Sequence, residues 1–169
     1  MSQSSKRWIL FFFCCSQILI SFNISALIAA VPAMARSLNV NPGDVAGVVT
    51  YYMIPYGLCA LGFVPLACFI SVKRLLIFSS ALFALGSWIC LWSDSIYVIM
   101  AGRIISGIAA AAVTPLAIMT LGKIFDKQVR GRVLGLFFSS AFFGSIFGLL
   151  CSAIASWHWL FIIPTILGL

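Results

Sequence analysis

Negative charge is the scarcest feature of this 169-residue sequence. It contains no glutamate and only three aspartates, Asp44, Asp94 and Asp126. Charged residues make up 8% of the chain and apolar residues 63%, whereas soluble domains are about 25% charged and roughly 45–50% apolar. A water-facing fold of this length cannot cover its own apolar side chains, so we expect most of the chain to lie in lipid.

Groups that titrate or bind metals are almost as rare. His158 is the single histidine, and the cysteines lie in apolar runs without CxxC spacing: Cys14, Cys15, Cys59, Cys68, Cys90 and Cys151. These cysteines are typical of small buried hydrophobic residues, so we expect no metal, disulfide framework or cofactor. An intramembrane enzyme is also excluded, because the apolar runs supply no catalytic Asp, Glu or His.

The net charge of +7 does not indicate nucleic-acid binding. Nucleic-acid binders carry their basic residues as a solvated patch. Here the basic residues separate long apolar runs, and we exclude nucleic acid as a partner.

Five of these runs are long enough to cross a bilayer, which takes about 20 mostly apolar residues. The sequence predicts an all-α integral membrane protein, with one amino-terminal bundle over residues 1–169. The expected helices cover about 8–35, 45–72, 75–93, 96–122 and 132–156. Residues 159–169 would begin a sixth helix but are too short to cross, which favours a fragment of a longer protein.

Orientation follows from the positions of Lys and Arg beside the spans. If the amino terminus is cytoplasmic, eight cations lie on the inner side: Lys6, Arg7, Lys73, Arg74, Lys123, Lys127, Arg130 and Arg132. The outer side carries only Arg36, so we expect a multi-pass protein of the plasma (inner) membrane with its amino terminus inside. The inner loops would contain Lys73 and Arg74, and then Arg130, Gly131 and Arg132.

The amino terminus also has features of a secretory signal. Lys6 and Arg7 precede an apolar stretch that ends in the small-residue triplet Ala33, Met34 and Ala35. That stretch has 28 residues, however, whereas the core of a signal peptide has roughly 7 to 15. A retained first helix is therefore favoured.

Arg103 is the residue that costs most to place in the membrane. It follows Asp94 by nine positions, which sets it roughly 13 Å below the outer headgroups at about 1.5 Å per residue. Insertion of such a charge costs at least about 2.5 to 3.5 kcal/mol and usually marks a bundle interior or a transport pathway. The alternative is an arginine that extends to the interface.

No carboxylate inside the spans can pair with Arg103. Asn23 is the first candidate partner, because it lies near the middle of the first helix at comparable depth, and Gln17, nearer the inner side, is the second. Either amide could equally form an ordinary interhelical hydrogen bond with no part in transport. If the complete protein is proton-driven, its proton acceptor lies elsewhere.

Small residues recur at every fourth position in the fifth helix, including Ser140, Gly144, Gly148 and Ser152. Such a stripe permits close approach of another helix, in a contact that is either static or sliding. In the fourth helix, Gly107 follows Arg103 at the same spacing. Pro115 then predicts a bend, because it removes a backbone hydrogen bond.

In this order the motifs resemble the amino-terminal half of a Major Facilitator Superfamily transporter, in particular its drug-efflux branch. The segment from Gly102 and Arg103 to Gly107 is similar to the family's fourth-helix RxxxG motif. The segment from Arg130 through Gly131 and Arg132 is similar to its inner loop, and Trp157-His158-Trp159 to the entry of its sixth helix.

The resemblance implies a carrier in which two six-helix halves rock around one midplane site. It places Arg103 and Gly107 in the fourth-helix motif, Asn23 and Gln17 at the cavity, and Gly144 and Gly148 at a moving contact. The implied function is secondary active transport of a small organic solute, by efflux, together with a carboxy-terminal half. The alternative is a truncated or half-size membrane protein that packs against partners without transporting.

Overall fold

The computed structural model describes residues 3–93, 95–154 and 161–162. Within these ranges the chain is helical, without strands, in the order α1 (Gln3–Leu38), α2 (Pro42–Phe69), α3 (Val72–Leu91), α4 (Ile96–Ala110), α5 (Val113–Ile124) and α6 (Lys127–Ile154). The described part contains five stretches long and apolar enough to cross a membrane, with α4 and α5 counted together as one. The all-α membrane fold is therefore confirmed. The expected sixth helix at 159–169 lies outside the described residues except at 161–162.

Helices α3 and α6 begin earlier in the chain than the charged residues predicted. Lys73 and Arg74 lie in the first turn of α3, and Arg130, Gly131 and Arg132 lie within the first two turns of α6. The expectation that these five residues form loops is therefore corrected. A charged residue marks where the hydrocarbon ends, but a helix can continue past that level because its hydrogen bonds are internal to the segment.

The turn between α1 and α2 uses two local devices. Asn39 adopts a positive φ of 52°, and the Val40 N–H donates to the Ala35 carbonyl at 3.1 Å, the pattern of a Schellman helix end. Asn41 then precedes α2, and Pro42 occupies the first helical position, where its missing N–H costs nothing. The two helices thus reverse direction within a few residues.

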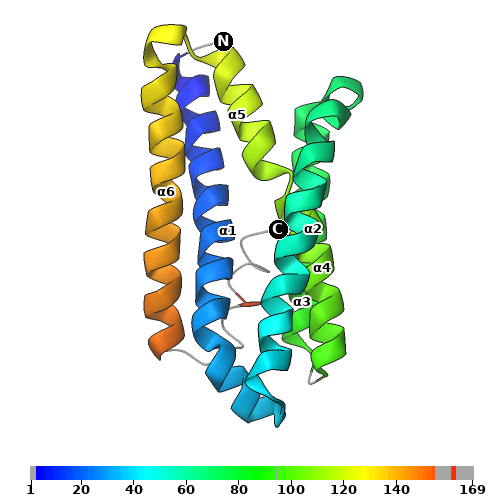
Figure 1. Ribbon diagram of the computed structural model, residues 1–169. Coiled ribbons are helices and arrows are strands. Elements are labelled where there is room, and N and C mark those ends of the chain that lie inside the picture. The colour runs from blue at the N-terminus through cyan, green and yellow to red at the C-terminus, as the bar shows by residue number, and fades with distance from the viewer. Residues whose placement is uncertain (1–2, 94, 155–160, 163–169) are drawn as a thin grey trace.

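The fourth span is interrupted at residues 111–112, one turn before Pro115. Pro115 has no N–H to donate to the Ala111 carbonyl, and its ring crowds that carbonyl. At the interruption the Ala112 N–H bonds to Ala109 in place of a residue four back. Figure 1 shows the result, because α5 leaves the end of α4 at a clear angle.

Two groups of helices are visible in Figure 1, with α1 and α6 side by side on one flank and α2, α3 and α4 on the other. Helix α5 crosses between the two groups. The amino end of α1, the α2–α3 connection and the α5–α6 connection lie at one end of the bundle. This cationic end, as we call it, therefore gathers the eight Lys and Arg residues of the predicted inner side.

Small residues hold α6 tightly against α1. A methyl group added at Gly148 would lie 2.6 Å from the Phe22 carbonyl oxygen, and one at Gly144 would lie 2.9 Å from Ile18 Cα. The predicted close helix contact is present, with α1 as the partner. Ser140 is buried on the same stripe and donates to the Phe137 carbonyl at 2.6 Å, and the Ser152 hydroxyl donates to Leu149.

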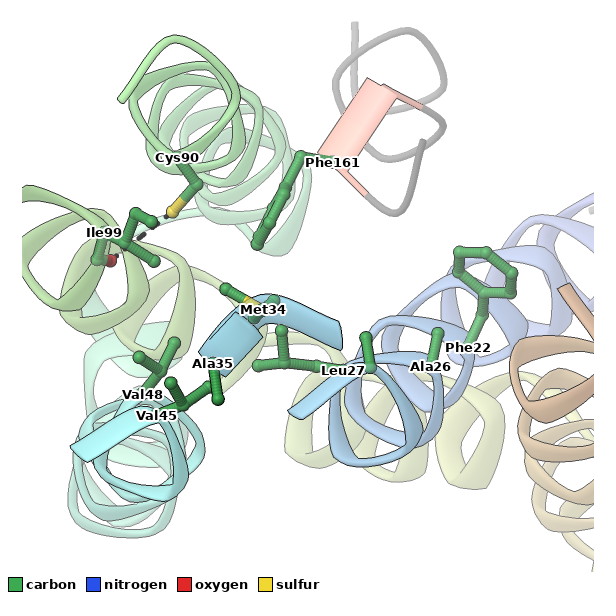
Figure 2. Packing of buried hydrophobic residues seen from close by; sticks show 11 residues of the cluster. Phe22, Ala26, Leu27, Met34, Ala35, Val45, Val48, Cys90, Ile99 and Phe161 are labelled. Carbon is green, nitrogen blue, oxygen red and sulfur yellow. Dashed lines mark hydrogen bonds between the residues drawn. The ribbon is translucent and has the colours of Figure 1, made fainter. Parts of the chain in front are cut away.

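A second close contact, between α3 and α4, is not anticipated by the sequence analysis. A methyl group at Gly86 would lie 2.8 Å from the Gly102 carbonyl oxygen, and one at Gly102 would lie 2.9 Å from the Gly86 carbonyl oxygen. The Cys90 thiol also donates to the Ile99 carbonyl at 3.5 Å (Figure 2). Gly86 and Cys90, with Gly102 and Ser106, form matched small-residue pairs at four-residue spacing, which is the signal that could have revealed this contact.

Away from the cationic end, an apolar cluster joins α1 to α2, α3 and α4. It includes Met34 of α1, Val48 of α2 and Cys90 of α3, all fully buried. Phe161 joins the same cluster, and in Figure 2 it lies between Cys90 and the α1 residues. The two groups of helices are therefore closely packed at this end.

The α1–α6 contact predicts that alanine substitutions at two glycines of α6 change the stability of the protein by different amounts. Gly148→Ala should destabilise the protein by about 1–3 kcal/mol, because the added methyl group forces α1 and α6 apart. Gly135→Ala is the control, since nothing lies within 4 Å of that position, and it should be neutral or stabilising by up to about 1 kcal/mol. Thermal unfolding in detergent measures both, and equal melting temperatures for the two variants would contradict the packing.

Candidate functional site

Arg103 lies at the centre of the bundle with 1% of its surface exposed. Its Nη1 donates to Asn23 Oδ1 of α1 at 2.5 Å. The predicted pairing of Arg103 with Asn23 is therefore confirmed. The Arg103 Nε finds no partner among the described residues.

An aromatic ring provides the second contact of the guanidinium group. Arg103 Cζ lies 4.2 Å from the ring centroid of Tyr52, a fully buried residue of α2. A desolvated cation on an aromatic face gains about 2 kcal/mol, and a hydrogen bond to a charged group gains about 1.5–3 kcal/mol. These two contacts together are comparable with the insertion cost of roughly 2.5–3.5 kcal/mol.

Gly107 makes this arrangement possible from one turn further along α4. A methyl group there would overlap the Tyr52 carbonyl oxygen and lie 3.3 Å from Tyr52 Cα. Because residues four apart share a helix face, the missing side chain lets α2 approach on the face that carries Arg103. The structure thus assigns Gly107 a packing contact with α2.

Gln17, the second candidate partner of Arg103, instead forms the interhelical hydrogen bond that was the alternative. Thr114 Oγ1, on α5, donates to Gln17 Oε1 at 3.3 Å, and the Tyr56 hydroxyl of α2 lies 3.1 Å from the same Thr114 oxygen. Tyr56 also stacks on Tyr52, with ring centroids 6.0 Å apart and planes inclined by 13°. Gln17 is therefore linked to Arg103 through Thr114 and the two tyrosines, and not directly.

These contacts form one connected group, which we call the polar junction. It draws residues from four helices: Gln17 and Asn23 from α1, Tyr52 and Tyr56 from α2, Arg103 from α4 and Thr114 from α5. The tyrosines and Thr114 are absent from the sequence-based site. The sequence did contain a signal for them, because Tyr52 and Tyr56 stand four residues apart and therefore on one face of a predicted span.

The polar junction contains a cation but no anion. Among the described residues, Asp44 lies in the first turn of α2 and Asp126 immediately before α6, both at helix ends. The described part of the chain also holds no group of three His, Cys, Asp or Glu side chains able to bind a metal. The junction can therefore offer a ligand hydrogen bonds, aromatic faces and one positive charge.

The remaining predicted site residues lie away from the junction. Gly144 and Gly148 face α1, and the loop candidates Lys73, Arg74 and Arg130 lie at the cationic end. Pro115 is the exception, because it directly follows Thr114 and lies in the first turn of α5, just after the interruption at residues 111–112. The junction thus adjoins the one described span whose helix is broken.

This arrangement, with polar groups buried among membrane helices beside a broken span, is characteristic of a multi-pass membrane transporter. The sequence matches the Major Facilitator Superfamily model over residues 13–169. The chain belongs to the Major Facilitator Superfamily, and the family assignment made from the motifs is confirmed.

Curated relatives of the chain include proteins named as multidrug resistance proteins and a transporter. The chain is 27% identical to "Putative multidrug resistance protein MdtD" of Pectobacterium carotovorum subsp. carotovorum (strain PC1), over 100% of this chain and 37% of that protein. It is 26% identical to the protein of the same name from Citrobacter koseri, over 98% of this chain and 36% of the relative. It is 30% identical to "Uncharacterized transporter YebQ" of Escherichia coli (strain K12), over 83% and 32% respectively. The chain thus spans about a third of the length of these relatives.

The contact between Arg103 and Tyr52 predicts that the ring of Tyr52 contributes more to the stability of the protein than its hydroxyl does. Tyr52→Phe keeps the aromatic face and removes a hydroxyl without a partner among the described residues, so the free energy of unfolding should change by less than about 1 kcal/mol. Tyr52→Leu removes the face under the cation and should cost about 2–3 kcal/mol. Thermal unfolding of both variants in detergent makes the comparison.

An Arg103→Met background provides the control, because the cation is then gone and Tyr52→Leu should cost less. Equal costs with and without Arg103 would contradict a stabilising contact between the two side chains.

Proposed function

We propose that this chain forms the amino-terminal half of a secondary active transporter, which exports a small organic solute by alternating access. The observation that carries the proposal is the complete burial of Arg103 in a membrane bundle with no carboxylate partner among the described residues. Charged residues in such positions usually serve a substrate or ion pathway. The family membership and the multidrug resistance name of the MdtD relatives support a small organic solute and efflux.

Arg103 and Asn23 act in this proposal as the polar centre for substrate binding or coupling. Asn23 orients the guanidinium group, and Gln17 holds Thr114 beside the broken span. Gly107 acts indirectly, by allowing α2 to bring Tyr52 beneath the cation. No titratable carboxylate belongs to the polar junction, so a coupling proton would be accepted by the remainder of the transporter.

The moving parts in this proposal are the break at Pro115 and the α1–α6 contact. Broken helices commonly surround the central site of secondary transporters, and here the break lies beside Thr114. The stripe with Gly144 and Gly148 has few side-chain obstacles to a small displacement of α6 along α1. The carboxy-terminal half would close the other side of the same site.

A half-size membrane protein without transport activity is the second candidate function. The chain covers 37% and 36% of the two MdtD proteins, a share that both candidates have in common. The reading frame downstream of Leu169 separates the two candidates. About six further apolar spans support the transporter, and a stop codon at that point supports the half-size protein.

Transport by the complete protein tests the role of Arg103. Arg103→Ala should reduce solute flux in reconstituted vesicles at least tenfold, because the polar junction loses its cation. Arg36→Ala is the matched control and should leave flux unchanged, since Arg36 is exposed at the opposite end from the cationic cluster. Normal transport by a correctly folded Arg103→Ala protein would remove Arg103 from the site.

We further propose that the cationic end faces the cytoplasm, which places the amino terminus inside. A cysteine-free variant carrying Gln128→Cys, at the start of α6, should react with a membrane-impermeant maleimide only after the cells are opened. Asn39→Cys, between α1 and α2, is the control and should react in intact cells. Labelling of Gln128→Cys from outside intact cells would overturn the orientation.

A further inference from the structure

A groove lies between α1 and α6 near the cationic end of the bundle. It has a volume of about 310 Å³, and its apolar walls include Leu10 and Phe11 of α1 and Leu136 and Phe143 of α6. The side chains of Phe11, Leu136 and Phe143 are 60%, 56% and 69% exposed, so the groove is open on one side. Figure 1 shows α1 and α6 side by side, with the first turns of both helices at this end.

Small residues leave the space for this groove between two closely packed helices. Further from the cationic end, Gly144 and Gly148 bring α6 against the backbone of α1. One turn closer to the cationic end, Ser140 continues the stripe, and it lines the groove together with Cys14 of α1. The Ser140 hydroxyl already donates to the Phe137 carbonyl. The interior of the groove therefore suits an apolar chain better than a polar solute.

Two arginines lie where the groove meets the cationic end. Arg7 lines the groove directly. Arg132 precedes Leu136 by four residues, which places it on the same face of α6 and one turn nearer the cationic end. Both arginine side chains are exposed, and Asp126 is the only carboxylate at this end within the described ranges. The groove thus combines an apolar interior with unneutralised positive charge at one end.

This combination matches the chemistry of an anionic phospholipid, which has a phosphate at the membrane surface and acyl chains below it. Basic pockets between transmembrane helices bind anionic lipid head groups, and arginine forms paired hydrogen bonds with phosphate. Trp8, next to Arg7, is 68% exposed, and exposed tryptophans are enriched at the headgroup level. From Arg7 to Cys14 the groove extends about 10 Å into the membrane, enough for the first part of one acyl chain.

We propose that the groove binds one anionic phospholipid, with its phosphate at Arg7 and Arg132 and one acyl chain between α1 and α6. Charge favours this occupant over a second copy of the chain, because a second copy in the same membrane would bring its own cationic end beside these arginines. The groove is also too short for a spanning helix, which needs roughly 30 Å. The proposal requires only that the cationic end lies at a membrane surface, and it is independent of transport.

Lipid binding to the complete protein in detergent tests the charged part of the site. Native mass spectrometry should detect one saturable phosphatidylglycerol, bound about tenfold more tightly than phosphatidylcholine. Arg7→Gln and Arg132→Gln should each weaken phosphatidylglycerol binding about fivefold, because each removes one cation near the head group. Arg74→Gln is the matched control and should leave the affinity unchanged, since Arg74 is an exposed arginine of α3 at the same end.

A second pair of variants tests the acyl-chain part of the site. Leu136→Trp should fill the groove and weaken phosphatidylglycerol binding about tenfold, the equivalent of roughly two displaced methylene groups. Leu149→Trp is the control, because Leu149 is an exposed residue of α6 that does not line the groove. Glycerol phosphate, which has the phosphate without the acyl chains, should not displace the bound lipid.

Four results would overturn the proposal. Equal affinity for phosphatidylglycerol and phosphatidylcholine would remove the role of charge, and an equal loss in Arg74→Gln would indicate diffuse attraction to the whole cationic end. Displacement by glycerol phosphate would make the site one for free phosphates. No saturable binding to the complete protein would mean that the remainder of the transporter or a second copy covers the groove. All substituted side chains are exposed, so each variant should melt at the parent temperature without added lipid.

Discussion

The placement of one guanidinium group in a bundle, with no carboxylate beside it among the described residues, constrains much of this structure. Arg103 must obtain from neutral groups what a carboxylate would otherwise supply, and it does so from the Asn23 amide oxygen and the face of Tyr52. These contacts come from two different helices, so α1, α2 and α4 must meet at one depth. The absence of a side chain at Gly107 is what lets α2 approach closely enough. Charge burial and small-residue packing are thus parts of one arrangement.

The same residues connect the two groups of helices, which also pack together in the apolar cluster of Met34, Val48 and Cys90. The α4 part of the broken span is held by α3 through Gly86 and Gly102, whereas the α5 part belongs to an apolar cluster with α1 and α6 that includes Phe13 and Leu121. The break near Pro115 therefore lies where the span passes from one group to the other. The polar junction crosses this boundary twice, through Arg103 with Asn23 and through Tyr56 with Thr114. A transporter that changes shape needs such boundaries, because tightly packed interiors deform little.

Counting residues along the helices predicted the depth of the site residues in the membrane. It did not predict which side chains of neighbouring helices contact one another. The pairing of Arg103 with Asn23 follows from the constant helical rise, which puts both at mid-membrane. The partner of Gln17 does not follow from depth, because it depends on how α5 rotates after the break. The ends of α3 and α6 were misplaced for another reason. Charge marks the edge of the hydrocarbon, while the backbone hydrogen bonds that define a helix continue beyond it.

The sequence by itself determined the lipid environment, the five spans, the end of the bundle that collects positive charge and the one costly residue. All of these depend on hydropathy and charge along one dimension. Only the tertiary structure decided that Tyr52 lies beneath Arg103 and that Gly86 faces Gly102. The physical reason is that a helix in lipid is apolar on every side, so its composition does not reveal which face meets a neighbour. That choice is made by close packing between particular small and large side chains, which only the assembled bundle defines.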